Sequence, residues 1–510
     1  MILIALSPIL WLIVALTVLH MSAWKACTAA LLIAWTAGLG IYGMTPAHAA
    51  EATLEGAALA CWPILLVIIA AIFTYNLSLH TRSMDTIKQM LTSVSSDKRV
   101  LILLIGWGFG SFLEGMAGFG TAIAIPAGML VGLGIPPLLA ASVCLIANSV
   151  PTAFGSIGIP LITLGSVTGI ADSRLSLYTA LQLAPLSLLC PFLMTIVTGG
   201  SLKALKGMIS YCLAAGLGFI LPEIAIAAFL GPDLAVIAGS IGTMGAIVLC
   251  AKLFPQSDTA YTMPAHEEAP AIDARKGLLA WLPFILIFVF LLVTSKLIPA
   301  LHDPLSLIKT SVLIYDGAGG APYTFTWVAT PGVLIFLAAF LGGHLQGAGM
   351  AEMLSVLKTT AINLRFTIIT IITVIATAKV MGYAGMTFDI ATTAVAATGT
   401  LYPVIAAFIG SIGTFITGSA TSSCVLFGKL QTDSAVAIGA GEAGQAWLAA
   451  ANATGACAGK MISPQSIAIA IGAIGVQGCD SKLLRFAVKV YIPFVLLMGA
   501  IVYCGFFFLQ

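Results

Sequence analysis

The sequence predicts an all-α polytopic membrane protein with about 12 transmembrane helices, two re-entrant helical hairpins and two inverted repeats with broken helices. Three observations carry this prediction. Of the 510 residues, 60% are hydrophobic and 8% are charged, whereas soluble proteins carry about a quarter charged residues. Apolar segments of about 20 residues, which suffice to cross a bilayer, recur along the whole chain. One stretch rich in Gly, Ser, Thr, Asn and Pro occurs twice.

The two copies of this stretch match each other position by position. Residues 106–126 read GWGFGSFLEGMAGFGTAIAIP, and residues 408–428 read FIGSIGTFITGSATSSCVLFG. Each is followed by a second polar stretch, LIANSVPTAFGSIGIP at 145–160 and AAANATGACAGKMISPQS at 449–466. Glu114 pairs with Thr417 at an offset of 303, and Asn148 pairs with Asn452 at an offset of 304. Agreement to within one residue over such a separation indicates an internal repeat.

The repeated stretches place helix-breaking residues at membrane depth. Backbone groups freed by a break cannot face lipid, so they must lie inside the protein or line a cavity. Paired broken helices in the two halves of a chain point to a transporter's binding site. Close helix packing through small residues is the alternative. It explains a pair of glycines, but it explains less well why Asn, Pro and Ser recur in register.

Twelve segments are apolar enough to be predicted as spans. They are residues 2–20, 24–43, 56–79, 138–170, 175–199, 208–230, 233–253, 277–297, 327–345, 366–385, 446–475 and 483–508. The helix-break-helix pattern of residues 100–133 and 402–430 predicts the two hairpins. Apolar residues at helical spacing between basic ones predict interfacial helices at 80–99 and 349–365.

The chain divides into two repeat halves, residues 1–253 and 277–510, joined by a polar linker at 254–276. The basic loops share one side if both hairpins return to the side that they enter. The positive-inside rule assigns that side to the cytoplasm. Both chain ends then lie outside, the repeat is inverted, and the linker is cytoplasmic.

Composition and motifs exclude several classes of function. A net charge of +2 gives no reason to expect a nucleic acid partner. The ten cysteines are scattered singly, as packing residues are, so we expect neither disulfides nor a metal site nor any other cofactor. None of the six histidines lies in the repeated stretches, and HExxH and GxSxG are absent. The sequence therefore favours a transporter over an enzyme.

At the repeated stretches the chain resembles the L-lactate permease family. The resemblance rests on FGSFLEGMAGFG at 109–120, LIANSVPTAFGSIGIP at 145–160 and GKMISPQSIAIA at 459–470, in the order and spacing of that family. It implies a secondary transporter that imports lactate, glycolate and related 2-hydroxy monocarboxylates with protons. The second hairpin departs from the family pattern, because Ala420 and Cys424 stand where the family usually has Asp and Asn.

A 2-hydroxy acid needs hydrogen-bond donors and positive potential for its carboxylate and a polar partner for its hydroxyl. Helix N-termini supply the first two, and breaks at 115–118, 148–151, 418–422 and 452–455 would create four of them. Serine and threonine hydroxyls could bind the substrate hydroxyl or bond back to their own helices. The residues expected to bind substrate are Gly115, Asn148, Ser149, Thr152, Thr417, Gly418, Ser419, Thr421, Asn452, Thr454 and Lys460.

Ionisable residues at membrane depth are costly and usually functional. Glu114 at the first hairpin break is the candidate proton carrier, and its alternative is a structural ion pair with a lysine. Lys460 could bind the substrate carboxylate or pair with Glu114. Lys379 is a second candidate for proton coupling, although it could also extend from a span end toward water.

Three functions remain open at this point. The first is proton-coupled import of 2-hydroxy monocarboxylates across the cell (inner) membrane. The second is sodium-coupled carboxylate transport, because unwound carbonyls can also hold Na⁺. The third is an anion channel. The expected partners are a small monocarboxylate, protons and the lipid bilayer. The physiological acid, the stoichiometry and the oligomeric state stay open.

Overall fold

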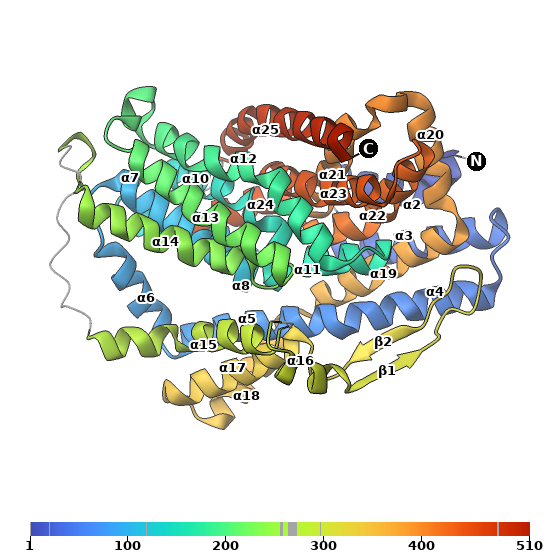
Figure 1. The fold of residues 1–510 in the computed structure, drawn as a ribbon, viewed down its shortest axis with the longest axis horizontal. Helices are drawn as coiled ribbons and strands as arrows, with labels where there is room; N and C mark the ends of the chain where they lie inside the picture. The colour runs from blue at the N-terminus through green and yellow to red at the C-terminus, as the bar shows by residue number, and fades with distance from the viewer. Residues whose placement is uncertain are drawn as a thin grey trace.

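The chain folds as a bundle of long, mostly parallel or antiparallel helices (Figure 1). The computed structural model describes residues 2–19, 21–118, 120–255, 259–263, 273–295, 297–476 and 479–509. Within these residues, ten helices are long and apolar enough to cross a membrane, or eleven if the bent pair Glu442–Ile462 and Pro464–Ile474 is one span. The predicted all-α polytopic class is confirmed, but by this measure the count is below twelve.

The first half holds the helices up to residue 253. They are α1 (Ile2–Ala5), α2 (Ser7–Thr17), α3 (Ala23–Gly40), α4 (Pro46–Leu59), α5 (Leu66–His80), α6 (Ser83–Thr92), α7 (Lys98–Leu101), α8 (Gly110–Met116), α9 (Thr121–Gly132), α10 (Pro137–Asn148), α11 (Gly155–Thr168), α12 (Asp172–Gly199), α13 (Ile209–Phe229) and α14 (Ala235–Leu253). The π-helical segments η1 (Ala60–Leu65) and η2 (Ile102–Phe109) join α4 to α5 and α7 to α8. The 3₁₀ turn η3 (Pro151–Phe154) precedes α11.

The second half holds the remaining elements. They are α15 (Ala274–Val293), α16 (Pro299–Ser306), β1 (Lys309–Val312), β2 (Tyr323–Thr326), α17 (Pro331–Leu345), α18 (Met350–Asn363), α19 (Arg365–Ala384), α20 (Met386–Thr398), α21 (Tyr402–Thr417), α22 (Ala420–Ala437), α23 (Glu442–Ile462), α24 (Pro464–Ile474) and α25 (Asp480–Leu509). The polar loop predicted at 298–326 contains α16 and an antiparallel hairpin that pairs Lys309 with Thr326.

Some element bounds differ from the prediction for local reasons. α4 begins ten residues before the predicted start at 56, because the Thr45 hydroxyl accepts a hydrogen bond from the backbone N–H of His48. Pro46 also suits a first helical position. The spans predicted at 2–20 and 327–345 form apolar helices of only 10 to 17 residues. The linker residues His266, Glu267 and Glu268 lie outside the described residues.

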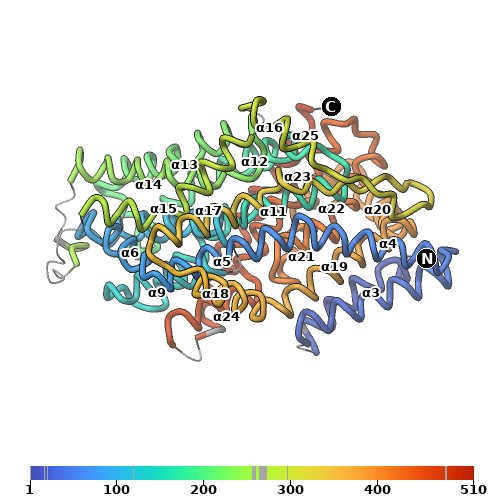
Figure 2. The backbone as a smooth tube through the Cα atoms, turned by 90° about the horizontal axis from the view of Figure 1, so that it is seen from below, coloured from blue at the N-terminus to red at the C-terminus, as the bar shows by residue number. Residues whose placement is uncertain are grey.

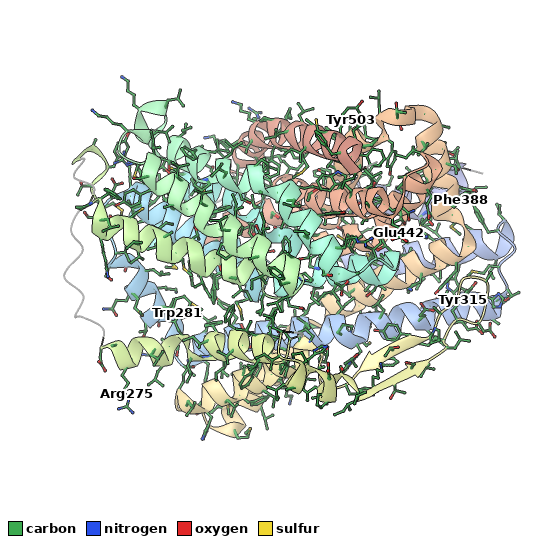
Figure 3. The ribbon with its side chains drawn as sticks, in the orientation of Figure 1. Arg275, Trp281, Tyr315, Phe388, Glu442 and Tyr503 are labelled. Carbon is green, nitrogen blue, oxygen red and sulfur yellow. The ribbon has the colours of Figure 1, made fainter. Side chains whose placement is uncertain are left out.

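Basic loops gather at one end of the bundle, which we call the basic end. There the Arg99 guanidinium donates to the carbonyls of Ala204 and Lys206, and the N–H of Met263 donates to the carbonyl of Ser96. Figure 3 shows Arg275 at this end and Tyr315, in the β1–β2 loop, at the opposite end. By the positive-inside rule, this is the end expected to face the cytoplasm.

The two halves interlock through the repeated stretches. α9 follows the first hairpin break and packs against α24, whereas α22 follows the second break and packs against α11. Figure 2 shows α9 and α24 at the same edge of the molecule. The N–H of Ala153 donates to Sγ of Cys457 at 3.1 Å, and these two residues are separated by the repeat offset of 304. The contacts α9–α24 and α22–α11 therefore join equivalent elements of the two predicted repeats.

Three of the four predicted breaks interrupt helices. The first hairpin breaks between α8 and α9, where Gly118 and Gly120 have φ of +61° and +86°. The second hairpin breaks at Gly418, with φ of +70°. α10 ends at Asn148, and the following span is kinked at residues 156–158, which adopt left-handed conformations.

The fourth predicted break, at residues 452–455, is wrong. α23 runs unbroken from Glu442 to Ile462, and the chain bends by 47° only before α24. A Cβ on Gly455 would lie 1.9 Å from the carbonyl oxygen of Ala407. This glycine therefore lets α21 and α23 approach closely, so small-residue packing, the alternative interpretation, holds here.

Candidate binding site

Both repeated stretches line one cavity of about 410 Å³. The first contributes Glu114, Thr152, Gly155, Ser156 and Pro160, and the second contributes Thr417, Gly418, Ser419, Ala420, Thr421, Ser422, Lys460 and Gln465. The cavity reaches exposed residues at the basic ends of α3 and α19, where the rings of Trp24 and Phe366 stack at 5.6 Å. It therefore opens toward the basic end.

Each half closes its hairpin break with a side chain from its own broken span. The Ser156 hydroxyl donates to the carbonyl of Ala117 at 2.8 Å, and the Lys460 ammonium donates to the carbonyl of Gly418 at 3.0 Å. Ser156 and Lys460 are counterparts at the repeat offset of 304. Carbonyls freed by the breaks thus obtain donors, as buried backbone requires, and the second half does this with a positive charge.

The N-terminus of α22 faces the cavity. Residues 419–422 line it, and the Ser419 side chain caps the helix by accepting from the backbone N–H of Ser422 at 3.3 Å. The other N–H groups of a first helical turn have no acceptor within the helix. Together with the helix dipole, they favour an anion at this position.

Glu114 and Lys460 place an acidic and a basic side chain in the same cavity without forming an ion pair with each other. Both are buried, and Oε2 of Glu114 has no hydrogen-bond partner among the described residues. Oε1 lies above Gly155, where a Cβ would approach it to 2.7 Å. The ammonium of Lys460 is directed to the Gly418 carbonyl instead. The alternative of a Glu114–Lys460 ion pair is therefore not what this conformation contains.

Five residues expected to bind substrate lie behind the cavity wall. Asn148 donates to the Thr152 hydroxyl at 2.9 Å, and Asn452 donates to the carbonyl of Ser423. The Ser149 hydroxyl bonds back to the carbonyl of Ile146. The other two make contacts of their own: Thr454 donates to Gln182 and Gly115 packs against Val236 and Ile237. These residues position the lining rather than form it.

Lys379 lies apart from this cavity. Its ammonium is 2.7 Å from Oε1 of Glu55, and the hydroxyl of Tyr383 donates to both oxygens of the same carboxylate. This group lines a second cavity toward the opposite end. A role for Lys379 in proton transfer at the first cavity therefore has no support from its position.

The repeat pattern missed the part of the lining that comes from α3 and α19. These residues are Ser22, Ala23, Trp24, Phe366, Thr367, Thr370 and Ile371. They lie outside the repeated stretches, and their sequences resemble ordinary apolar spans, so no sequence pattern marks them as cavity residues. Gln465 could have been predicted as a lining residue, because it directly follows the proline at which the second broken span bends.

The family comparison and the sequence relatives agree on one family. Residues 1–508 match the L-lactate permease family. An L-lactate permease of Streptococcus iniae is 42% identical over 84% of this chain and 90% of its own length. The glycolate permease GlcA of Escherichia coli K12 is 33% identical, covering 98% and 94% of the two chains. The solved YdaH transporter of Alcanivorax borkumensis covers 82% of this chain and 86% of its own, with 15% identity and a TM-score of 0.35.

Proposed function

Because the chain belongs to the L-lactate permease family, we propose that it imports L-lactate and related 2-hydroxy monocarboxylates such as glycolate by proton symport. Its relatives are named lactate and glycolate permeases, which supports lactate and glycolate as cargo and a transporter rather than an enzyme. The ten or eleven apolar spans among its described residues make it an integral membrane protein, and we assign it to the cell membrane.

The cavity's one ammonium and one helix N-terminus carry this proposal. Lys460 and the first turn of α22, at Ser419 and Thr421, provide the positive charge and donors that a single carboxylate needs. The hydroxyls of Thr152 and Thr417 line the same space and suit the 2-hydroxyl of the substrate. Glycolate and lactate share this pair of groups, which explains how one site accepts both.

Glu114 is the proposed proton carrier. It is the carboxylate among the described lining residues, and one of its oxygens has no partner that would fix it in the ionised form. A proton on that oxygen would supply a donor to the cavity. Backbone and hydroxyl groups do not change protonation state near neutral pH, and a lysine is normally protonated there, so coupling assigned to this cavity falls to Glu114.

Uptake of radiolabelled lactate into proteoliposomes tests the function. With an inwardly directed proton gradient and no sodium, we expect saturable accumulation that a protonophore abolishes and that excess glycolate inhibits. Accumulation that requires a sodium gradient would show that Na⁺, rather than the proton, is the coupled ion. Lactate currents without saturable, gradient-driven accumulation would instead indicate a channel.

A further inference from the structure

A second cavity of about 480 Å³ lies toward the opposite end and shares three helices with the first. α11 lines the first cavity at Pro160 and the second at Ser166. α19 lines them at Ile371 and Ala378, and α22 lines them at Ser422 and at Val425. Because each helix passes from one cavity to the other, the two cavities lie one behind the other along the bundle.

Only a thin layer of protein separates the two cavities. At a rise of 1.5 Å per residue, it spans about 10 Å along α19 and about 5 Å along α22. Residues 373–377 of α19 and residues 423–424 of α22 are buried between the cavities. We call this layer the seal. It closes the first cavity on the side that faces away from the basic end.

Two lysines present positive charge to the second cavity. Lys379 pairs with Glu55, and Lys429 pairs with Asp433 at 2.9 Å. In both pairs the carboxylate is the more deeply buried partner, with 4% and 10% of the side chain exposed against 17% and 46% for the lysines. An ammonium has three N–H donors, so each lysine retains donors for an anion that enters the cavity.

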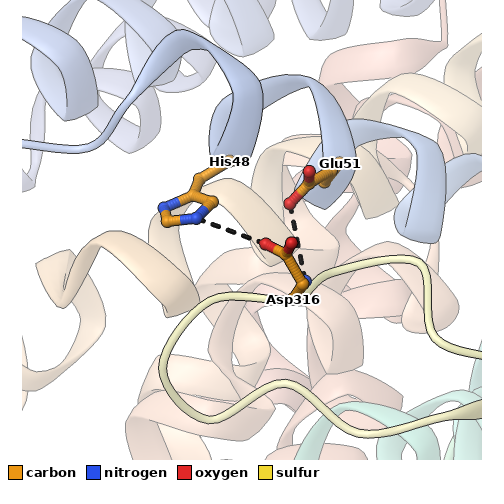
Figure 4. Close-up of side chains that lie close together, drawn as sticks. All are labelled: His48, Glu51 and Asp316. Carbon is orange, nitrogen blue, oxygen red and sulfur yellow. Dashed lines mark hydrogen bonds and ion pairs between the residues drawn. The ribbon is translucent and has the colours of Figure 1, made fainter.

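The β1–β2 loop builds the outer wall of the second cavity. Gly319 and Pro322 line it, and the ring of Tyr315 stacks on Tyr383 with centroids 3.7 Å apart. Next to it, Oδ1 of Asp316 lies 3.3 Å from Nε2 of His48 on α4, as Figure 4 shows. These contacts tie the loop to α4 and α19, so the wall is part of the folded structure.

We infer that the second cavity is the outer vestibule through which the carboxylate substrate enters, with Lys379 and Lys429 attracting it before it passes the seal. The inference rests on the proposed function for the identity of the substrate. It assigns Lys379 to anion attraction rather than to proton coupling. It also assigns the described conformation to the state open to the cytoplasm, because the first cavity reaches the basic end.

Thiol labelling tests the vestibule without relying on transport. In a chain whose exposed or half-buried cysteines Cys61, Cys250 and Cys504 are replaced by serine, Ser166→Cys places a thiol in the second cavity. Thr370→Cys is the matched variant in the first. With membrane-impermeant methanethiosulfonates, we expect Ser166→Cys to react from the outside of vesicles and Thr370→Cys from the cytoplasmic side.

The charge of the reagent tests the role of the lysines. Relative to a free thiol in solution, an anionic reagent should label Ser166→Cys several-fold faster than a cationic one. Adding Lys429→Gln should reduce this preference, whereas Lys309→Gln, at an exposed lysine of β1 that does not line the cavity, should leave it unchanged. Lactate should slow the labelling.

Two results would contradict the vestibule inference. One is that outside reagents do not label Ser166→Cys. The other is that, with Lys429 unchanged, the anionic and cationic reagents label it at equal rates. Failure of the vestibule inference and failure of the proposed function give different results. If lactate neither accumulates nor slows labelling but the charge preference holds, the vestibule serves another anion and the substrate assignment is wrong. If lactate accumulates while the charge preference is missing, the vestibule inference alone fails.

Discussion

Among single residues, Glu114 is the proposed proton carrier. Glu114→Gln keeps the shape of the side chain and removes its titration. We expect this variant to lose lactate accumulation driven by a pH gradient but to retain exchange of internal for external lactate, since exchange needs binding without net proton movement. Both are measured in the same proteoliposomes.

The two roles considered for Glu114 give different outcomes. If Glu114 served mainly as a counter-charge for Lys460, its replacement would weaken lactate binding and stability together, because a buried lysine without a partner is costly. A Glu114→Gln protein that still concentrates lactate on a pH gradient would exclude the coupling role.

Asp233 adds a pH-dependent contribution to stability outside the spans. It lies in the turn between α13 and α14, where burial and then the nearby charge of Asp172 raise the pKa of its carboxyl from 3.8 to about 7. A raised pKa means that its contribution is fully present below the unfolded value and is lost as the pH rises through about 7. The folded state therefore disfavours the ionised carboxylate at pH 8.

Asp233→Asn should remove this dependence. We expect the melting temperature of the variant minus that of wild type to be about 2 °C higher at pH 8 than at pH 5. Thermal unfolding of both proteins in detergent measures this difference. Asp303→Asn, at an exposed carboxylate of the neighbouring α16, is the control and should show no such gain. A constant difference between Asp233→Asn and wild type across this range would contradict the assignment.

At the scale of elements, the second hairpin break places Gly418 directly under Gln465. A Cβ at Gly418 would lie 1.9 Å from Oε1 of Gln465, whereas a Cβ at Gly439, which also has positive φ, meets nothing within 4 Å. Alanine at either position costs about 1–2 kcal/mol for the left-handed backbone. Gly418→Ala should therefore lose at least as much stability as Gly439→Ala, because it must also displace Gln465.

Only the variant at the break should change transport. Gly418→Ala must move Gln465 within the cavity, so we expect its KM for lactate to rise several-fold while Gly439→Ala keeps the wild-type value. Uptake kinetics of both proteins measure the KM, and thermal unfolding measures the stability. An equal change of KM in both variants would mean that Gln465 does not contribute to binding.

The pairing of α4 with α19 depends on a buried ion pair. Glu55 and Lys379 lie 2.7 Å apart, and removing one partner leaves the other charge buried alone, at a cost of about 3 kcal/mol. We expect Glu55→Gln and Lys379→Met each to destabilise the protein strongly and the double variant to recover about 1–3 kcal/mol of the summed loss. Thermal unfolding of the four proteins measures this coupling, and additive losses would contradict it.

The repeat made the walls of the first cavity predictable, but it did not separate lining from support. Glu114, Thr152 and Lys460 line the cavity, whereas Asn452 and Gly455 lie within an unbroken helix. The same small and polar residue types serve helix packing and substrate contact, so position in the sequence alone does not distinguish them.

Contacts between distant, unrepeated parts of the chain were beyond the sequence. Lys379 was a candidate because it is a charge at membrane depth, but its partner Glu55 precedes the span predicted to begin at 56. The early start of α4 at Pro46 brings that carboxylate into the bundle. A pair that is 324 residues apart in the chain leaves no periodic signal, so only the fold reveals it.

For the whole molecule, the supply of positive charge in the first cavity limits the substrate. Lys460 is the amine among its described lining residues, and a second carboxylate would be buried without a counter-charge. We therefore expect succinate to compete with labelled lactate at least ten-fold less well than glycolate does. Competition by succinate equal to that by glycolate would contradict this single-charge site.

The thin seal also has an electrical consequence. Ions in solution can enter both cavities, so the membrane potential falls mainly across the seal, over about 10 Å rather than the about 30 Å of lipid. The local electric field is then about threefold stronger than in the surrounding bilayer. An unaccompanied charge that crosses this layer gains or loses about 2.3 kcal/mol per 100 mV. Lactate that crosses with a proton has no net charge, so it passes the steepest part of the field without electrical work.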